Sequence, residues 1–141
     1  MKTSISKVVI HATAGEVWKA LTLPELVKKW QYGTDLATDW SKGGPIVFRN
    51  EWNGDVFIQN GTVLLFDPAR TLRYSLFAPR PGMEDSPENR FVMTYQLVET
   101  NGSTELTILQ EDPREPESQE SEEDKGENPT LRALKELVEN G

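Results

Sequence analysis

The sequence predicts an α+β domain in which a curved antiparallel sheet of six or seven strands wraps around a C-terminal helix. Three observations support this fold class. One strand-like segment rich in β-branched residues is followed at once by two short amphipathic segments, which predict two short helices. A series of strand-like segments then contains two Asn-Gly pairs, which are typical of hairpin turns. A last segment with a leucine stripe predicts the helix that covers the apolar face of the sheet.

Size and composition limit the class of protein. The chain has 141 residues, which fits one domain spanning residues 1–141. It contains no cysteine, so disulfides, thiolate zinc sites and cysteine nucleophiles are excluded. The apolar run near the start extends only from Val8 to Ile10, which is too short for a signal peptide or a membrane span. We therefore expect a cytoplasmic protein that does not bind membranes.

The first elements are predicted by local signals. The segment from Ile5 to Ile10 reads as a strand, because it is rich in β-branched residues. Thr13 and Glu16 form a T-x-x-E capping box, which predicts a helix start. Pro24 suits the first turn of a second helix, because the amide hydrogen that proline lacks has no helical partner there.

The middle of the chain reads as consecutive strands. Asn53-Gly54 and Asn101-Gly102 are strong hairpin signals, because both residue types tolerate positive φ angles. The segment 78–89 contains three prolines and is predicted to be a long loop. The predicted strands of this part lie near residues 45–52, 56–66, 72–77, 90–99 and 104–110.

The net charge of −8 is concentrated in one segment. Residues 111–127 carry nine acidic and two basic residues, which leaves a net charge of only −1 for the rest of the chain. Nucleic acid is therefore not an expected partner, because no basic surplus exists to displace counterions from phosphates. The segment lacks aromatic and branched aliphatic side chains, so we expect it to be mobile. It either solubilises the protein or binds a basic partner, and solubilisation is the usual role of such charge runs.

The chain shows no convincing catalytic or metal-binding constellation. His11 is the only histidine, and a general base needs an orienting partner and a position facing the substrate. We therefore expect no catalytic residue, no metal and no cofactor. Arg49 and Arg73 alternate with the apolar residues of their strands, which predicts exposure to solvent. If one of them points inward, it is a candidate partner for a ligand carboxylate.

Aromatic and aliphatic residues on the predicted inner faces are candidates for lining a cavity between sheet and helix. Residues of these types also build ordinary cores, and that alternative stays open. The terminal helix, from about Pro129 to Glu139, is expected to lie over the sheet face that carries Phe91, Met93 and Tyr95. The candidates are Trp30, Trp40, Phe48, Trp52, Tyr74, Phe91, Met93, Tyr95, Leu131, Leu134 and Val138.

Several short motifs occur in an order that points to a known family. Those at the start are Ala12, Val17-Trp18, Ala20-Leu21-Thr22, Pro24-Glu25 and Trp30. Those further along are Gly61-Thr62-Val63, Asp67-Pro68, Leu72-Arg73-Tyr74 and the run Thr104 to Thr107. Together they resemble the activator of heat-shock protein 90 ATPase homologue-like family, within the START-like (SRPBCC, helix-grip) superfamily. The resemblance covers about residues 5–110 and the last helix.

The resemblance implies a helix-grip fold and a binding function. The expected ligand is a small hydrophobic or amphipathic molecule held between the sheet and the C-terminal helix. The alternative that the family name implies is a protein-interaction role as a chaperone ATPase activator-like protein, with a chaperone as partner. An enzyme of the cyclase or hydrolase type is a third hypothesis, and the lack of an acid–base pair argues against it.

Overall fold

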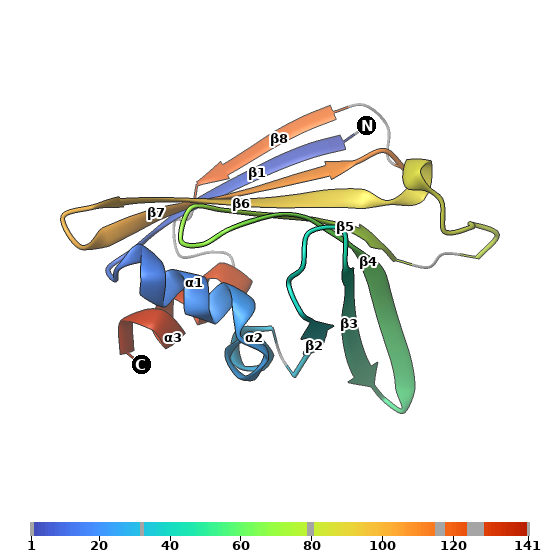
Figure 1. Ribbon diagram of the computed structural model, residues 1–141, viewed down its shortest axis with the longest axis horizontal. Coiled ribbons are helices and arrows are strands. Elements are labelled where there is room, and N and C mark those ends of the chain that lie inside the picture. Colours follow the sequence, from blue (N-terminus) through green and yellow to red (C-terminus); the bar gives the residue numbers. More distant parts are fainter. Residues whose placement is uncertain (1, 32, 79–80, 115–117, 124–128, 141) are drawn as a thin grey trace.

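The computed structural model describes residues 2–31, 33–78, 81–114, 118–123 and 129–140 (Figure 1). One sheet is formed in the order β2-β3-β4-β5-β6-β7-β1-β8. Its strands are β1 (Lys2–Ile10), β2 (Asp35–Thr38), β3 (Pro45–Trp52), β4 (Asp55–Asp67), β5 (Thr71–Phe77), β6 (Phe91–Thr100), β7 (Ser103–Asp112) and β8 (Ser118–Glu123). The helices are α1 (Ala14–Thr22), α2 (Pro24–Trp30), α3 (Pro129–Asn140) and the 3-10 turn η1 (Pro87–Asn89).

The arrangement confirms the predicted fold class. All three α-helices lie on the same side of the sheet, and the β3–β4 hairpin bends toward that side (Figure 1). Strands β1 to β7 pair antiparallel with their neighbours. The sheet therefore curves around the helices, as in a helix-grip fold. The longest helix of the described residues, α3, has 12 residues, and none of these helices is long and apolar enough to cross a membrane.

Two strands were not predicted. Strand β2 has only four residues, which is too few to give a clear periodic pattern. Strand β8 lies inside the acidic segment 111–127 and pairs in parallel with β1, from Lys2 opposite Ser118 to Lys7 opposite Glu123. Backbone groups make this pairing, so it needs no apolar side chain. The expected mobility of the segment stays a prediction, and its residues 115–117 and 124–127 lie outside the described part of the chain.

The first two helices begin where local signals placed them. Thr13 is the N-cap of α1, and its Oγ1 accepts a hydrogen bond from the Glu16 amide at 3.3 Å. Pro24 is the first residue of α2, as expected from its missing amide hydrogen. Val17 and Trp18 of α1 are buried, so the apolar face of this helix packs into the core.

Helix α3 lies differently from the prediction. Its main contacts are with α1, α2 and β1 rather than with β6. Polar contacts fix it there: Lys135 Nζ donates to the Val9 carbonyl, and Glu139 Oε2 accepts from the His11 amide at 2.8 Å. These bonds hold the C-terminal half of α3 against the end of β1. The helix thus covers one side of the sheet and does not fill the space above β5 and β6.

Strands β4 and β5 approach each other very closely at Gly61, which lies opposite Leu76. A Cβ atom added to Gly61 would lie 1.7 Å from the Ser75 carbonyl oxygen. Two residues further, the register shifts between Val63 and Leu65. Such bulges bend a strand and increase its twist, so this part of β4 contributes to the curvature of the sheet.

Candidate functional site

A cavity of about 690 Å³ lies between the inner face of the sheet and the helices α2 and α3. This volume falls within the range of about 300–1,000 Å³ that is typical of small-molecule sites. Residues of six strands, β1, β3, β4, β5, β6 and β7, and of the two helices line it. The apolar lining residues are Trp30, Phe48, Phe57, Leu76, Ala78, Phe91, Met93, Ile108 and Leu131.

Most of the residues predicted from the sequence reach this cavity. Those that line it are Trp30, Phe48, Tyr74, Phe91, Met93, Tyr95 and Leu131. These residues belong to the helices α2 and α3 and to the strands β3, β5 and β6. Their position is therefore established, whereas a role in binding stays a prediction.

Three of the predicted residues lie elsewhere, and a fourth cannot be placed. Trp40 has a φ angle of 60° and stacks on Phe66, with ring centroids 5.4 Å apart. Its Nε1 donates to the Thr22 carbonyl, which holds the ring against α1. Leu134 and Val138 are buried in the core without lining the cavity. The side chain of Trp52 lies outside the described part of the structure.

Sequence reasoning missed the polar side of the cavity. Asn50 Nδ2 donates to Thr34 Oγ1 at 2.9 Å, and Thr34 Oγ1 donates to the Gln31 carbonyl at 2.7 Å. The alternation of side chains along β3 could have identified Asn50, because Asn50 lies on the same face of the strand as the buried residues Ile46 and Phe48. The polar lining residues are Ser6, Gln31, Thr34, Asn50, Gln59, Gln110 and Arg114, together with the hydroxyls of two tyrosines.

The two tyrosines, Tyr74 and Tyr95, form a buried pair. Their hydroxyl oxygens are 3.0 Å apart, and their ring centroids are 5.9 Å apart. Phe48 packs on the other side of Tyr74, with ring centroids separated by 5.6 Å. Burial raises the pKa of both phenols above the ordinary value of 10.0, and the neighbouring Tyr95 adds to the effect at Tyr74. Both hydroxyls therefore keep their protons at neutral pH.

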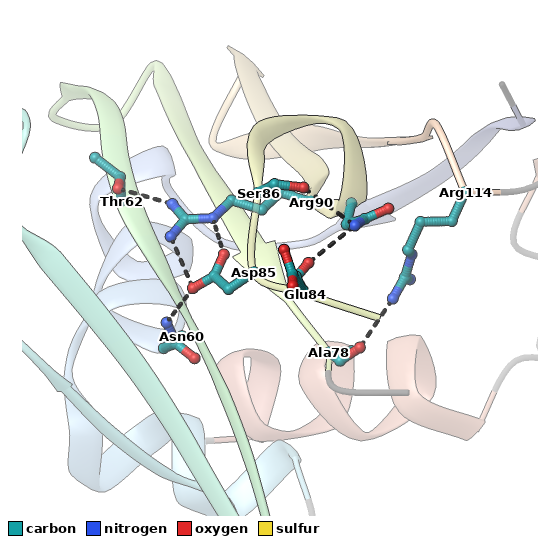
Figure 2. Close-up of polar contacts among 9 residues, drawn as sticks. Asn60, Thr62, Ala78, Glu84, Asp85, Ser86, Arg90 and Arg114 are labelled. Atoms are coloured by element: carbon teal, nitrogen blue, oxygen red, sulfur yellow. Dashed lines mark hydrogen bonds and ion pairs between the residues drawn. The ribbon is translucent and has the colours of Figure 1, made fainter. Parts of the chain in front are cut away.

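Arg114, which lines the cavity, forms a buried ion pair with Asp112. Arg114 Nε and Nη2 donate to the two oxygens of Asp112, each at 2.9 Å, and the two side chains are only 4% and 6% exposed. Arg114 Nη1 also donates to the Ala78 carbonyl at 3.1 Å (Figure 2). The guanidinium carbon lies 5.1 Å from the centre of the Phe91 ring. This arginine was missed because it belongs to the acidic segment that was expected to be mobile.

A second ion pair anchors the loop between β5 and β6. Arg90 donates from Nε to Asp85 Oδ1 at 2.7 Å and from Nη1 to Thr62 Oγ1 at 3.2 Å. Asn60 donates to Asp85 Oδ2, so two residues of β4 hold this loop (Figure 2). The hydrogen bonds from Arg90 lower the pKa of the Asp85 carboxyl, while burial opposes this effect.

The other charged candidates are exposed. Arg49 and Arg73 are 45% and 47% exposed, and their ion pairs with described acidic residues are 3.5–4.0 Å long. The predicted exposure of both arginines is therefore confirmed. His11 is also exposed; its Nδ1 lies 3.2 Å from Ser103 Oγ, and it does not line the cavity. No cluster of three possible metal ligands occurs among the residues that the structure describes.

Comparisons with known proteins place this arrangement in a family. The family model described as activator of Hsp90 ATPase homolog 1-like protein matches residues 11–139. No protein with a curated description matches the chain. The solution structure of ChR145 from Cytophaga hutchinsonii is similar, with 31% identity, a TM-score of 0.73, and coverage of 98% of this chain and 94% of that chain.

Two further structures share the fold at lower sequence identity. Protein NE0264 from Nitrosomonas europaea has a TM-score of 0.71 and 20% identity, and the match covers 98% of this chain and 94% of that chain. The Aha1 dimer from Colwellia psychrerythraea has a TM-score of 0.69 and 18% identity, with coverage of 99% and 97%. The family model extends over nearly the whole chain, including most of the cavity lining and most of the terminal helix. The chain therefore belongs to the activator of Hsp90 ATPase homolog 1-like family.

Proposed function

We propose that the protein binds one small amphipathic molecule in the cavity between the sheet and helices α2 and α3. The observation that supports this most directly is the cavity itself, with a volume of about 690 Å³ and a lining that combines aromatic and aliphatic side chains with seven polar residues. Apolar walls supply affinity through the removal of apolar surface from water, and convergent polar groups fix the orientation of the ligand.

A cavity-filling variant tests this proposal. Met93 lines the cavity from β6, whereas Val98 on the same strand is 62% exposed. Met93→Trp should fill part of the cavity and abolish saturable binding of the neutral dye N-phenyl-1-naphthylamine, measured by fluorescence titration. Val98→Trp adds the same side chain to the same strand and should leave dye binding unchanged. Equal affinity in both variants, or no saturable binding to the natural sequence, would count against the proposal.

The second candidate function is a protein-interaction role of the chaperone ATPase activator type. Family membership supports it, and so do three consecutive exposed apolar residues of β4, namely Val56, Phe57 and Ile58. Exposed apolar groups of this kind are common at sites of protein contact. The test is the ATPase rate of a 90-kDa heat-shock chaperone with and without this protein. Stimulation that is lost in Val56→Ser/Ile58→Ser would favour this function over small-molecule binding.

A further inference from the structure

We propose that the hydroxyl pair of Tyr74 and Tyr95 recognises a carbonyl oxygen on an uncharged ligand. This inference rests on the proposed function, because it requires that a small molecule occupies the cavity. It goes further by naming the chemical class of the ligand: a ketone, ester, amide or quinone carried on an apolar skeleton. The pair lies in the cavity wall, and both tyrosines are almost fully buried, at 4% and 5% exposed.

A count of protons shows why the pair needs an acceptor. Each hydroxyl carries one proton, and the contact between the two oxygens, 3.0 Å apart, uses only one of these protons. The second proton remains available whichever tyrosine is the donor. Among the residues that the structure describes, neither hydroxyl has another hydrogen-bond partner. Buried donors without an acceptor are rare in proteins, so a ligand or a water molecule is needed at this point.

The charges around the cavity favour an uncharged acceptor. Arg114 is the only charged side chain in the described lining, and the carboxylate of Asp112 binds it through two hydrogen bonds. Asp112, which lies outside the described lining, therefore already balances the guanidinium charge. A ligand carboxylate would lose its hydration and would have to compete with Asp112 for this one cation, which is costly. Burial raises the pKa of both phenols, so both tyrosines stay protonated and can donate a hydrogen bond to a neutral acceptor.

Hydrogen-bond strength also distinguishes a carbonyl from a plain hydrocarbon. A hydrocarbon of the same shape would fill the space and leave the spare hydroxyl proton unpaired. A carbonyl oxygen accepts that proton and offers none that would compete for the tyrosine oxygens. The rings of Phe48 and Tyr74, 5.6 Å apart, supply flat apolar surface beside the hydroxyl pair. A flat aromatic skeleton bearing one carbonyl therefore matches this part of the wall.

The experiment uses three probes of nearly identical shape. These are 2-acetylnaphthalene, 2-ethylnaphthalene and 2-naphthoate, each measured at pH 7 by displacement of N-phenyl-1-naphthylamine from the full chain. We expect the ketone to bind about three- to tenfold more tightly than the hydrocarbon, which is the usual net effect of one hydrogen bond. The naphthoate should bind most weakly. Tightest binding by the naphthoate, or equal affinity for ketone and hydrocarbon, would overturn the inference.

Matched variants test whether the tyrosine pair causes the preference. Tyr74→Phe/Tyr95→Phe removes both hydroxyls while keeping both rings, so it should bind the hydrocarbon normally and lose the preference for the ketone. Each single variant retains one hydroxyl whose proton is released from the pair, so at least one of them should keep the preference. A ketone preference that persists in the double variant would overturn the assignment to this pair.

The outcomes also separate this inference from the proposed function. If all three probes bind without a preference for the ketone, only the inference fails. If none of the probes displaces the dye and the dye itself does not bind saturably, the proposed function fails and the inference fails with it. Thermal unfolding followed by circular dichroism serves as the folding control for each variant. Replacing both partners of a buried hydrogen bond by groups of the same shape is nearly neutral, so the double variant should remain folded.

Discussion

Gly61 is the position at which a single added methyl group should damage the sheet most. A Cβ atom at this residue would lie 1.7 Å from the Ser75 oxygen, 2.5 Å from the Ser75 carbonyl carbon and 3.0 Å from the Leu76 Cα. All three atoms belong to the backbone of β5, so no change of rotamer can relieve the overlap. Strands β4 and β5 would have to move apart by more than about 1 Å, since carbon–oxygen contacts closer than about 3 Å do not persist.

The expected cost of Gly61→Ala follows from this geometry. Overpacking a well-filled site usually costs about 1–3 kcal/mol, even where side chains can move aside. Here the backbone itself must move, and the pairing of Gly61 with Leu76 and of Thr62 with Ser75 would be lost. Each lost hydrogen bond adds about 1 kcal/mol. We therefore expect a loss of about 3–5 kcal/mol, a large part of the 5–15 kcal/mol that is typical of whole domains.

Urea unfolding followed by tryptophan fluorescence measures this loss, with Gly15→Ala as the control. Gly15 lies in α1, and the nearest atom to an added Cβ is Thr13 Oγ1 at 4.0 Å. Alanine should therefore fit there and stabilise the helix by up to about 1 kcal/mol. A Gly61→Ala variant with an unfolding midpoint equal to that of the natural sequence would refute the reasoning.

Two further predictions concern charged groups. Asp112→Asn removes the carboxylate that binds the buried Arg114. Urea unfolding should therefore show a loss of about 3–5 kcal/mol in the free energy of unfolding. A loss below about 1 kcal/mol would contradict the role of the pair. The His11 amide, and then Lys135, lower the pKa of Glu139 below its ordinary value of 4.5. The stabilising effect of the ionised Glu139 carboxylate should therefore be present at pH 6 and above, and it should be lost as the pH falls through the folded-state pKa of Glu139. The difference in unfolding free energy between the natural sequence and Glu139→Gln should shrink toward pH 3, and a difference independent of pH would disprove this.

Local signals predicted the parts of the fold that depend on neighbouring residues. The cap at Thr13 and the helix start at Pro24 involve atoms within one turn, so the sequence reports them directly. The terminal helix was predicted, but its position over β1 was not. That position depends on Lys135 and Glu139 reaching backbone groups of Val9 and His11, more than 120 residues away in the chain.

The candidate site was predicted in part for the same reason. Alternation along a strand identified Phe48 and Tyr74 as inward-facing, and the same pattern contained Asn50, which is polar and was passed over. Trp40 was assigned to the site by residue type, but its positive φ angle directs the ring to Phe66 instead. Arg114 reaches the Ala78 carbonyl 36 residues earlier in the chain, and no local pattern reports such a contact.

Strand β8 has a consequence for how the sheet ends. It covers the edge of β1, so the outermost strand on this side has the sequence Ser-Gln-Glu-Ser-Glu-Glu, with three acidic residues among six. An open strand edge offers unpaired backbone groups to any other extended chain. A second β8 added to this edge would place two strands of this acidic sequence next to each other. Like charges on adjacent strands disfavour pairing, so the sequence of β8 is of the kind that opposes growth of a sheet at its edge.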